Sequence, residues 1–271
     1  MIQQIGMIGT GNMGSAILRG IVEARYIRAS MITAFDASSK RMRELEEDIP
    51  GVCLAADCRE VAEKSDLIIL AVKPIYVQEV IDEIHPYING KSVLSIAAGW
   101  TVSMLSKALE NSGAAYMRVM PNTPALVGEG MTALCDDSTF SREDFDYVKG
   151  IFDSIGKTRI LPERLFDGVT AISGSSPAYV YMMIEAMADA GVREGLPRVY
   201  AYEMAAQSVL GSALMVLSSG THPAALKDAV CSPGGTTIEG VLALEKGGLR
   251  AAVEDAVIAA DEKTKALAGG K

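Results

Sequence analysis

The chain is poor in the side chains that most often bind metal ions. Its 271 residues include only two histidines and four cysteines, and the cysteines are scattered without a CxxC pair. Zinc and iron–sulfur sites need several such ligands at close spacing, so we expect no metal site. The same scatter argues against a disulfide framework and is typical of a protein that works in the reducing cytoplasm.

Positive charge is also scarce, with 25 Lys and Arg residues against 34 Asp and Glu residues and a net charge of −9. Such a chain has no general electrostatic attraction for nucleic acid or for an anionic membrane, so we expect neither as a partner. Although 49% of the residues are apolar, each long apolar stretch is interrupted before it reaches membrane-spanning length. The N-terminus enters a strand-like run at once, which predicts no secretory signal. The surplus apolar surface is expected in a core or between subunits.

The pattern of apolar residues divides the chain into two regions. Up to Pro162, amphipathic helical runs alternate with β-rich runs, which are IGMI, MITAF, LIILAV, SVLSIA, AYMRVM and MTALC. This alternation predicts βαβ units and a largely parallel, doubly wound sheet. From Glu163 the runs are long, follow the helical period and are rich in Ala and Met. We predict an α/β domain over residues 1–162 and an all-helical domain over residues 163–271.

A glycine-rich turn follows the first β-rich run. Its sequence, GTGNMG at residues 9–14, leads directly into the helical pattern SAILRGIVEA. In a strand–turn–helix of this form the first Gly allows a tight turn, the second lets a pyrophosphate approach the backbone, and the third lets the helix pack closely. We predict a dinucleotide site with contacts from Ile8, Gly9, Thr10, Gly11, Asn12 and Met13.

The end of the second β-rich run bears on which dinucleotide binds. Asp36 lies 22 residues after Gly14. An acidic side chain there normally accepts hydrogen bonds from the ribose hydroxyls of NAD and repels the 2′-phosphate of NADP. The next residues, Ser38, Ser39, Lys40 and Arg41, offer hydroxyls and positive charge of the kind that holds a 2′-phosphate. NADH and NADPH therefore both stay open as cofactors, with Asp36 and Ser38 as predicted contacts.

Three further segments are expected at the same edge of the sheet, because each follows a predicted strand and parallel strands bind ligands at their carboxyl ends. Small residues there leave room for the nicotinamide and its ribose. The predicted cofactor contacts are Ala71, Val72, Lys73, Pro74, Ala97, Ala98 and, in the polar loop MPNTP, Asn122. For Lys73 we expect a positioning role rather than a catalytic one.

One stretch of the helical region breaks the helical pattern, namely CSPGGTTIEG at residues 231–240. Its two glycines remove side-chain cover, and its two threonines open the next helix. A Gly-Gly turn at a helix start is an anion site. The motif alone supports this interpretation and a simple helix break with a Thr cap about equally.

The chain resembles the pyrroline-5-carboxylate reductase family in several stretches, which occur in the family's order: GTGNMG, AVKP, VMPNTPALVGEGM, SGSSPAYVYMMIEAMADAG and HPAALKDAVCSPGGTTIEGV. The resemblance runs from about residue 2 to 267. It implies an N-terminal Rossmann domain and a C-terminal helical domain that forms an intertwined homodimer, often within a ring of dimers such as a decamer. It also implies the last step of proline biosynthesis, in which NADPH or NADH reduces 1-pyrroline-5-carboxylate to L-proline.

The resemblance assigns roles to the loop that breaks the helical pattern. In the family the backbone amides of this loop hold the substrate carboxylate, and its second threonine lies near the ring nitrogen. This implies substrate contacts from Ser232, Gly234, Gly235, Thr236 and Thr237, with Thr237 as the catalytic residue. Glu163 corresponds to a family position that contacts bound proline. The chain departs from many relatives at Cys58, where they carry Asn near the adenosine ribose, so cofactor preference transfers least securely.

The implied chemistry needs no strong general acid, because the cyclic imine can bind already protonated. This agrees with His85 and His222, which precede prolines in connecting segments and are expected to be structural. A β-hydroxyacid dehydrogenase would need a catalytic lysine at the start of the helical domain, and residues 173–191 contain none. A dinucleotide-binding sensor without turnover and a monomeric lid role for the helical domain stay open as alternatives.

Overall fold

The structure is a computed structural model that describes residues 2–269. The chain forms two compact units. The first runs up to Ser175 and also includes the C-terminal segment from Ala260, and the second is Ser176–Ala259. The chain therefore passes between the units twice.

The first unit is built on one eight-stranded sheet in the order β3-β2-β1-β4-β5-β6-β7-β8. Neighbouring strands are parallel except for β6 and β7, which are antiparallel. The strands are β1 (Ile5–Ile8), β2 (Ile32–Phe35), β3 (Cys53–Leu54), β4 (Leu67–Leu70), β5 (Ser92–Ser95), β6 (Ala115–Met120), β7 (Gly130–Cys135) and β8 (Gly156–Leu161).

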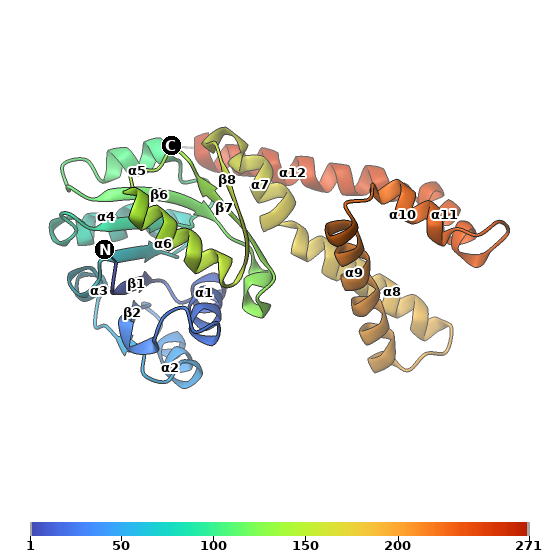
Figure 1. Cartoon of the computed structure of the whole chain (residues 1–271), viewed down its shortest axis with the longest axis horizontal. Coiled ribbons are helices and arrows are strands. Elements are labelled where there is room, and N and C mark those ends of the chain that lie inside the picture. Colours follow the sequence, from blue (N-terminus) through green and yellow to red (C-terminus); the bar gives the residue numbers. More distant parts are fainter. Residues whose placement is uncertain (1, 270–271) are drawn as a thin grey trace. The chain divides into compact units, whose positions relative to one another are not determined.

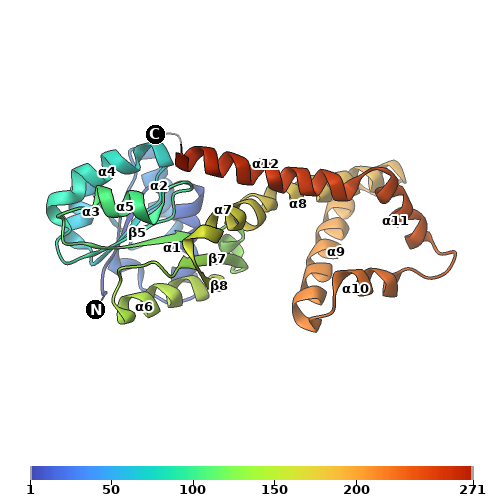
Figure 2. The ribbon, with the colours of Figure 1, turned by 90° about the horizontal axis from the view of Figure 1, so that it is seen from above.

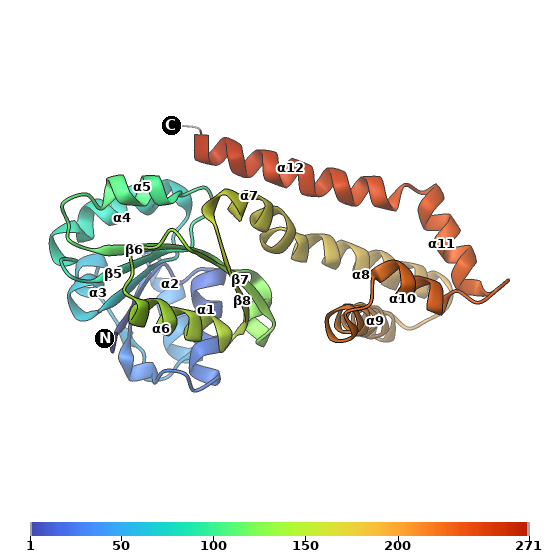
Figure 3. The same ribbon diagram turned by 45° about the horizontal axis from the view of Figure 1, so that its top comes forward.

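Helices cover both faces of this sheet (Figure 1). They are α1 (Asn12–Glu23), α2 (Ser39–Asp48), α3 (Cys58–Lys64), α4 (Val77–Ile84), α5 (Val102–Ala108), α6 (Arg142–Asp153) and the short α7 (Phe166–Val169). The apolar side chains of α1, α2 and α6 form a core on one face, and those of α3, α4 and α5 form a core on the other. Figure 3 shows α4 and α5 on the side of the sheet opposite α1 and α6. The predicted doubly wound, largely parallel sheet is confirmed.

The central strands supply both cores, which explains their continuous apolar sequences. In β4, Ile69 belongs to one core and Ile68 to the other, because successive side chains of a strand point to opposite faces. The apolar pattern does not predict β3 and β8, the two edge strands. The first has only two residues, and the second exposes Lys157 and Arg159 to solvent, as edge strands commonly do.

The chain after β8 is helical, as predicted from residue 163. Its first part nevertheless stays with the first unit, because Phe166 of α7 is fully buried in a cluster with Ala133 and Cys135 of β7. A π-helical turn, Thr170–Gly174, follows. The compact units therefore divide after Ser175, later than the predicted boundary at Pro162, since the side chain of Phe166 needs the sheet for its burial.

The second unit contains only helices and loops, as predicted. Its helices are α8 (Ser176–Arg193), α9 (Arg198–Ser219), α10 (Pro223–Val230), α11 (Thr236–Lys246) and the first part of α12 (Leu249–Gly269). Helices α8 and α9 pack along each other as a hairpin, and the Tyr179 hydroxyl of α8 donates a hydrogen bond to the Ala256 carbonyl of α12 at 3.2 Å. Figure 2 shows the loop between α10 and α11, which projects from the two helices. Among the described helices, none has the length and apolar character needed to span a bilayer.

Candidate functional site

The glycine loop lies between β1 and α1, where the strand order reverses between β1 and β4. Open α/β sheets bind ligands at this point. Gly9 has φ +97°, and a Cβ there would lie 2.7 Å from the Ala71 carbonyl oxygen. A Cβ on Gly14 would lie 2.1 Å from the Gly9 carbonyl oxygen. These two glycines are therefore required by the fold, as the motif predicts.

Gly11 differs from the other two glycines of the loop. The nearest atom to a Cβ built on Gly11 is Arg41 Nη1, at 3.7 Å, which is an ordinary contact distance. The chain itself therefore does not require glycine at this position. Glycine here leaves open space beside the loop, which is what the close approach of a pyrophosphate needs.

The loop also contains hydrogen-bonding groups that a ligand could use. Thr10 is 3% exposed, and its hydroxyl has no hydrogen-bond partner within the described part of the chain. A buried hydroxyl without a partner costs about 1–3 kcal/mol, which a ligand atom bonded to it would recover. The first turn of α1 has no acidic residue and no side-chain cap, so its backbone N–H groups can donate hydrogen bonds to an anion. The loop fits a dinucleotide.

Asp36, at the end of β2, is hydrogen-bonded to this loop. Its Oδ2 accepts a hydrogen bond from the Thr10 backbone N–H at 2.8 Å. Its Oδ1 accepts one from the Ser38 backbone N–H at 2.9 Å. Arg41 Nη1 lies 3.5 Å from Oδ2. The structure thus brings Asp36, Ser38 and Arg41, all of which the sequence singles out, together with the glycine loop.

The segments after β4 and β5 lie beside the loop, since β4 pairs with β1 and β5 pairs with β4. The Ala71 N–H donates to the Ile8 carbonyl oxygen at 2.8 Å. The Trp100 indole N–H donates to the Pro74 carbonyl oxygen at 2.8 Å, which ties residues 71–74 to the segment that contains Ala97 and Ala98. Lys73 is exposed, and Val72 is half-buried. These segments occupy the edge at which the nicotinamide contacts are predicted.

Asn122, in the loop after β6, is buried, and its amide is hydrogen-bonded within the first unit. Its Oδ1 accepts from the Met131 N–H at 2.8 Å, and its Nδ2 donates to the carbonyl oxygen of Ser173 at 3.1 Å. The bond to Ser173 ties the loop to the π-helical turn, a kind of turn that is frequent at functional sites. Contact between Asn122 and the nicotinamide stays a prediction.

Glu163 forms an ion pair with a buried arginine that the sequence does not reveal. Its Oε1 accepts from Arg118 Nη1 at 2.9 Å and from the Val102 backbone N–H at 2.6 Å. Arg118, on β6, is 3% exposed, and its guanidinium lies over the Phe166 ring, 4.9 Å from the ring centroid. Arg118 and Glu163 are 45 residues apart, and the only signal for the pair is a charged residue within the apolar run AYMRVM.

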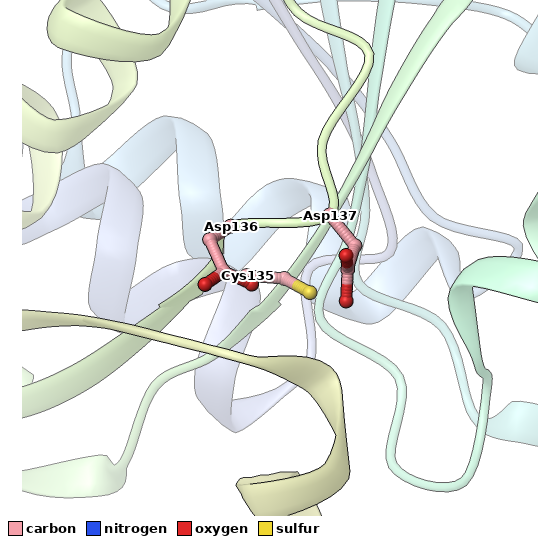
Figure 4. A group of neighbouring side chains, drawn as sticks. All are labelled: Cys135, Asp136 and Asp137. Atoms are coloured by element: carbon pink, nitrogen blue, oxygen red, sulfur yellow. The ribbon is translucent and has the colours of Figure 1, made fainter.

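A group of possible metal ligands lies at the end of β7, close to Glu163. Cys135, Asp136 and Asp137 offer ligand atoms within 4.8 Å of one another (Figure 4). Burial, and then the nearby acidic groups, raise the pKa of the Cys135 thiol to about 11. Metal ions bind the thiolate, so an ion at this group would have to displace the thiol proton. Asp137 Oδ2 also accepts from the Glu163 N–H at 3.4 Å.

The loop between α10 and α11 is a tight turn. The Gly235 N–H donates to the Ser232 carbonyl oxygen at 3.0 Å, and Gly234 has φ +66°. Pro233 at the second position and a left-handed Gly at the third are typical of a type II turn. The turn leads into α11, whose N-cap is Gly235 and which has no side-chain cap.

The start of α11 therefore presents amides that no side chain of the turn covers. The first amides of a helix have no partner within the helix, and they carry partial positive charge. Ser232, Gly234 and Thr236 are exposed, and Gly235 and Thr237 are half-buried. Within the second unit, this arrangement brings the predicted substrate contacts of the loop together at one helix start. The simple Thr cap is not formed, because the N-cap residue is glycine.

The two histidines have backbone hydrogen-bond partners. His85 Nε2 lies 2.9 Å from the Glu110 carbonyl oxygen. His222 is the N-cap of α10, and its Nδ1 accepts from the Ala224 N–H at 3.2 Å. Both contacts are of the structural kind that the sequence predicts.

Comparison with known proteins places this geometry in context. A family model described as pyrroline-5-carboxylate reductase dimerisation matches residues 163–267, and one described as coenzyme F420-dependent NADP oxidoreductase matches residues 4–99. The chain is 46% identical over 268 residues to the pyrroline-5-carboxylate reductase of Escherichia coli K12, covering 98% of this chain and 99% of that one. It is 41% identical to the Arabidopsis thaliana protein of the same name, covering 97% and 95%. The structure of the Plasmodium falciparum pyrroline carboxylate reductase with NADP bound matches with a TM-score of 0.90 at 36% identity, covering 98% of each chain.

Proposed function

Because this chain belongs to the pyrroline-5-carboxylate reductase family, it reduces 1-pyrroline-5-carboxylate to L-proline with hydride from NAD(P)H, and we propose that the start of α11 holds the substrate. The observation that carries this proposal is the uncapped helix start behind the type II turn of residues 232–235. Its amides are suited to a carboxylate, the one anionic group of the substrate.

The proposed roles of the loop residues follow from their positions. The turn amides and the first amides of α11 bind the carboxylate, with contacts from Ser232, Gly234, Gly235, Thr236 and Thr237. The Thr237 hydroxyl, one residue into the helix, lies near the ring nitrogen, where it stabilises the protonated imine and then the product amine. Glu163 is a further proposed substrate contact, although its carboxylate is already paired with Arg118.

The proposed cofactor contacts lie on the glycine loop, Asp36, Ser38, residues 71–74, Ala97, Ala98 and Asn122. NAD(P)H supplies the hydride when it is bound. The chain's own contribution is to fix the position of the substrate ring and to keep its nitrogen hydrogen-bonded, so that orientation supplies most of the rate acceleration. No general acid is required of this chain, because the imine binds protonated.

Thr237→Ala tests the catalytic role. We expect kcat/KM for pyrroline-5-carboxylate to fall about tenfold or more, the equivalent of one lost hydrogen bond to a charged group. Dinucleotide binding, measured separately by calorimetry, stays at the wild-type value. Thr237→Ser keeps the hydroxyl and restores most of the activity. Wild-type efficiency in Thr237→Ala would show that the assigned role is wrong.

Gly235→Val tests the carboxylate site. A Cβ at Gly235 would lie 2.3 Å from Ser232 Oγ and 3.2 Å from the Ser232 carbonyl oxygen, so the Ser232 hydroxyl has to move and the valine side chain adds bulk to the turn. We expect KM for the substrate to rise, while the second unit keeps its helical circular dichroism. An unchanged KM in a folded Gly235→Val protein would refute a carboxylate site at this turn.

The second domain serves dimerisation in this family, and the chain forms a homo-oligomer. Its finer organisation is a proposal: an intertwined homodimer, with five such dimers in a ring. Analytical ultracentrifugation distinguishes a dimer from a decamer. Location in the cytoplasm also stays a prediction, which cell fractionation tests.

A further inference from the structure

The ion pair between Arg118 and Glu163 carries an inference about how a proposed substrate contact of the first unit is oriented. The Arg118 side chain, on β6, is 3% exposed. Its Nη1 donates to Glu163 Oε1, whereas its Nη2 is buried and has no hydrogen-bond partner among the described residues. A buried nitrogen without a partner is costly, and apolar residues in place of a buried ion pair often give equal stability. Stability of the fold therefore does not account for Arg118.

The Arg118 guanidinium is held in one orientation. Its Cζ lies 4.9 Å from the centroid of the Phe166 ring, which is itself fully buried. Its Nη1 is bonded to the Glu163 carboxylate at 2.9 Å. Because a guanidinium is planar, a ring over its face and a carboxylate on one of its N–H groups leave it little freedom to turn. Arg118 therefore presents a fixed donor to Glu163.

The two oxygens of the Glu163 carboxylate have different surroundings. Oε1 accepts from Arg118 and also from the Val102 backbone N–H at 2.6 Å. Oε2 accepts no hydrogen bond from residues 2–269, and the Glu163 side chain is 24% exposed. Since a carboxylate oxygen has two lone pairs, Oε1 is fully used within the chain, and Oε2 remains available to a ligand.

The same carboxylate is tied to the segment between β5 and α5, in which two of the nicotinamide contacts are predicted. Val102, whose N–H bonds to Glu163, is the first residue of α5. Strand β6 pairs with β5, and Arg118 lies opposite Ser95, the last residue of β5. The ion pair therefore fixes Glu163 relative to the edge of the sheet where the nicotinamide is expected.

We propose that Arg118 is a positioning residue for the reaction of this reductase. By holding Oε1 of Glu163, it keeps Oε2 directed at the substrate, where Oε2 accepts a hydrogen bond from an N–H of the ring nitrogen. A cationic nitrogen suits a carboxylate oxygen, and protonated proline carries two such N–H donors. This inference rests on the proposed function, in which Glu163 is a substrate contact.

Two inhibitors that differ at the ring nitrogen test the contact in the NAD(P)H oxidation assay. L-Proline has the N–H groups, and cyclopentanecarboxylate has a CH₂ group in their place. We expect the wild-type inhibition constant to be about tenfold or more lower for L-proline, the effect of one hydrogen bond between charged groups. Glu163→Gln keeps an oxygen for Arg118 and Val102 but replaces the second oxygen by an NH₂ donor, so we expect it to lose most of this ratio.

Arg118→Met tests the positioning role, because it removes the guanidinium and leaves Glu163 in place. We expect the ratio to fall about tenfold, and Glu163→Gln added to it to lower the ratio no further, since both act on one contact. Arg118→Lys keeps the charge without the planar fork, so we expect an intermediate ratio, and this variant carries the test where Arg118→Met does not fold. The matched control is Val169→Ala, which removes another side chain packed against the Phe166 cluster, lowers stability and keeps the wild-type ratio.

The outcomes separate the inference from the proposed function. If the folded Arg118 variant keeps the wild-type ratio, or Val169→Ala lowers the ratio equally, Arg118 has only a structural role and the inference is overturned. A wild-type protein that does not distinguish the two inhibitors, or that neither of them inhibits during turnover, also overturns it. In these cases NAD(P)H is still oxidised and the reductase assignment stands. If 1-pyrroline-5-carboxylate causes no oxidation of NADPH or NADH, the proposed function itself fails.

Discussion

The two units of this chain bury their apolar side chains to very different extents. In the first unit, large side chains such as Ile17, Phe152 and Phe166 are fully buried on the two faces of the sheet. Among the described residues of the second unit, the buried apolar residues are only Ala188, Ala201 and Ala205. Large apolar side chains there remain exposed, for example Val199 at 73%.

This contrast shows how the two units obtain their stability. The first unit completes its own core, and this core supports the glycine loop, where we propose that the dinucleotide binds. A helical unit without a core of its own cannot offset the entropy of ordering its chain, and so many large apolar side chains left exposed in one unit mark an interface. The second unit therefore depends on another copy of the chain, which agrees with its dimerisation family.

We expect the largest effect from a change that disrupts the contact between subunits at the second unit. Leu210, Leu214 and Leu217 follow each other at helical spacing along α9 and are 47%, 46% and 66% exposed. Leu214→Asp places a charge in the middle of this stripe. Burial of an unpaired carboxylate costs several kcal/mol, so we expect the oligomer to dissociate into monomers, as measured by sedimentation velocity.

The control for this test is an apolar residue of the first unit that is more exposed than Leu214. Val127 is 76% exposed, and Val127→Asp is expected to leave the oligomer intact. A Leu214→Asp protein that sediments like the wild type would place the interface elsewhere on the second unit.

The next effect tests the ion pair between Glu163 and the buried Arg118 of the first unit. Glu163→Ala leaves the Arg118 guanidinium buried without its carboxylate, which is expected to cost about 3–5 kcal/mol of unfolding free energy. Urea denaturation measures the loss, and Arg118→Met added to Glu163→Ala recovers much of it. The exposed pair of Arg142 and Asp146 is the control, since Asp146→Ala is expected to cost less than about 1 kcal/mol.

This test also separates two roles of Glu163. A structural carboxylate changes stability with little change in substrate KM. Wild-type stability combined with a raised KM would instead assign Glu163 mainly to the substrate.

A smaller effect distinguishes the glycine that the fold requires, Gly14, from the glycine that leaves space for a ligand, Gly11. Gly14→Ala forces a Cβ against the Gly9 carbonyl oxygen, so we expect about 1–3 kcal/mol of lost stability. Gly11→Ala meets only ordinary contacts, so we expect nearly wild-type stability and weaker NADPH binding. Thermal unfolding and calorimetric binding measure the two. Equal loss of stability in both variants would contradict the distinction.

The smallest effect reports how closed the core formed by α3, α4 and α5 is. Burial, and then the nearby Glu83 carboxylate, raise the pKa of the Cys58 thiol to about 12. Because a raised pKa keeps the thiol protonated, we expect Cys58 to resist iodoacetamide throughout pH 6–9, as does Cys135. The exposed Cys53 is the internal control and reacts first. Mass spectrometry of tryptic peptides checks this, and equal labelling of Cys53 and Cys58 in the folded protein would mean that the core opens.

Much of the fold could be predicted from local pattern. The strands LIILAV and SVLSIA are continuously apolar because they are covered on both faces. The glycine turn is recognisable in the sequence because a predicted strand precedes it and a predicted helix follows it. Strand β8 escaped this pattern, since its exposed Lys157 and Arg159 give it no apolar run. The division of the compact units after Ser175 was also not visible in this pattern, because Phe166 needs the distant β7 for its burial.

The candidate site was predictable only in part. Asp36 was singled out by its spacing. The hydrogen bonds that its carboxylate accepts from the backbone N–H groups of Thr10 and Ser38 depend on how the loop folds back on β2. The pairing of Glu163 with Arg118 was not predictable, because the two residues lie on different elements of the first unit.

The resemblance of several stretches was sufficient for the family. Local patterns were sufficient for the two types of domain, the glycine turn and the turn before α11, because each depends on a few consecutive residues. The packed fold was needed to show that Asp36 braces a loop, that Glu163 has a buried partner and that the second unit lacks a core. These are properties of contacts between distant segments, and a contact of that kind exists only once the elements that carry it have packed together.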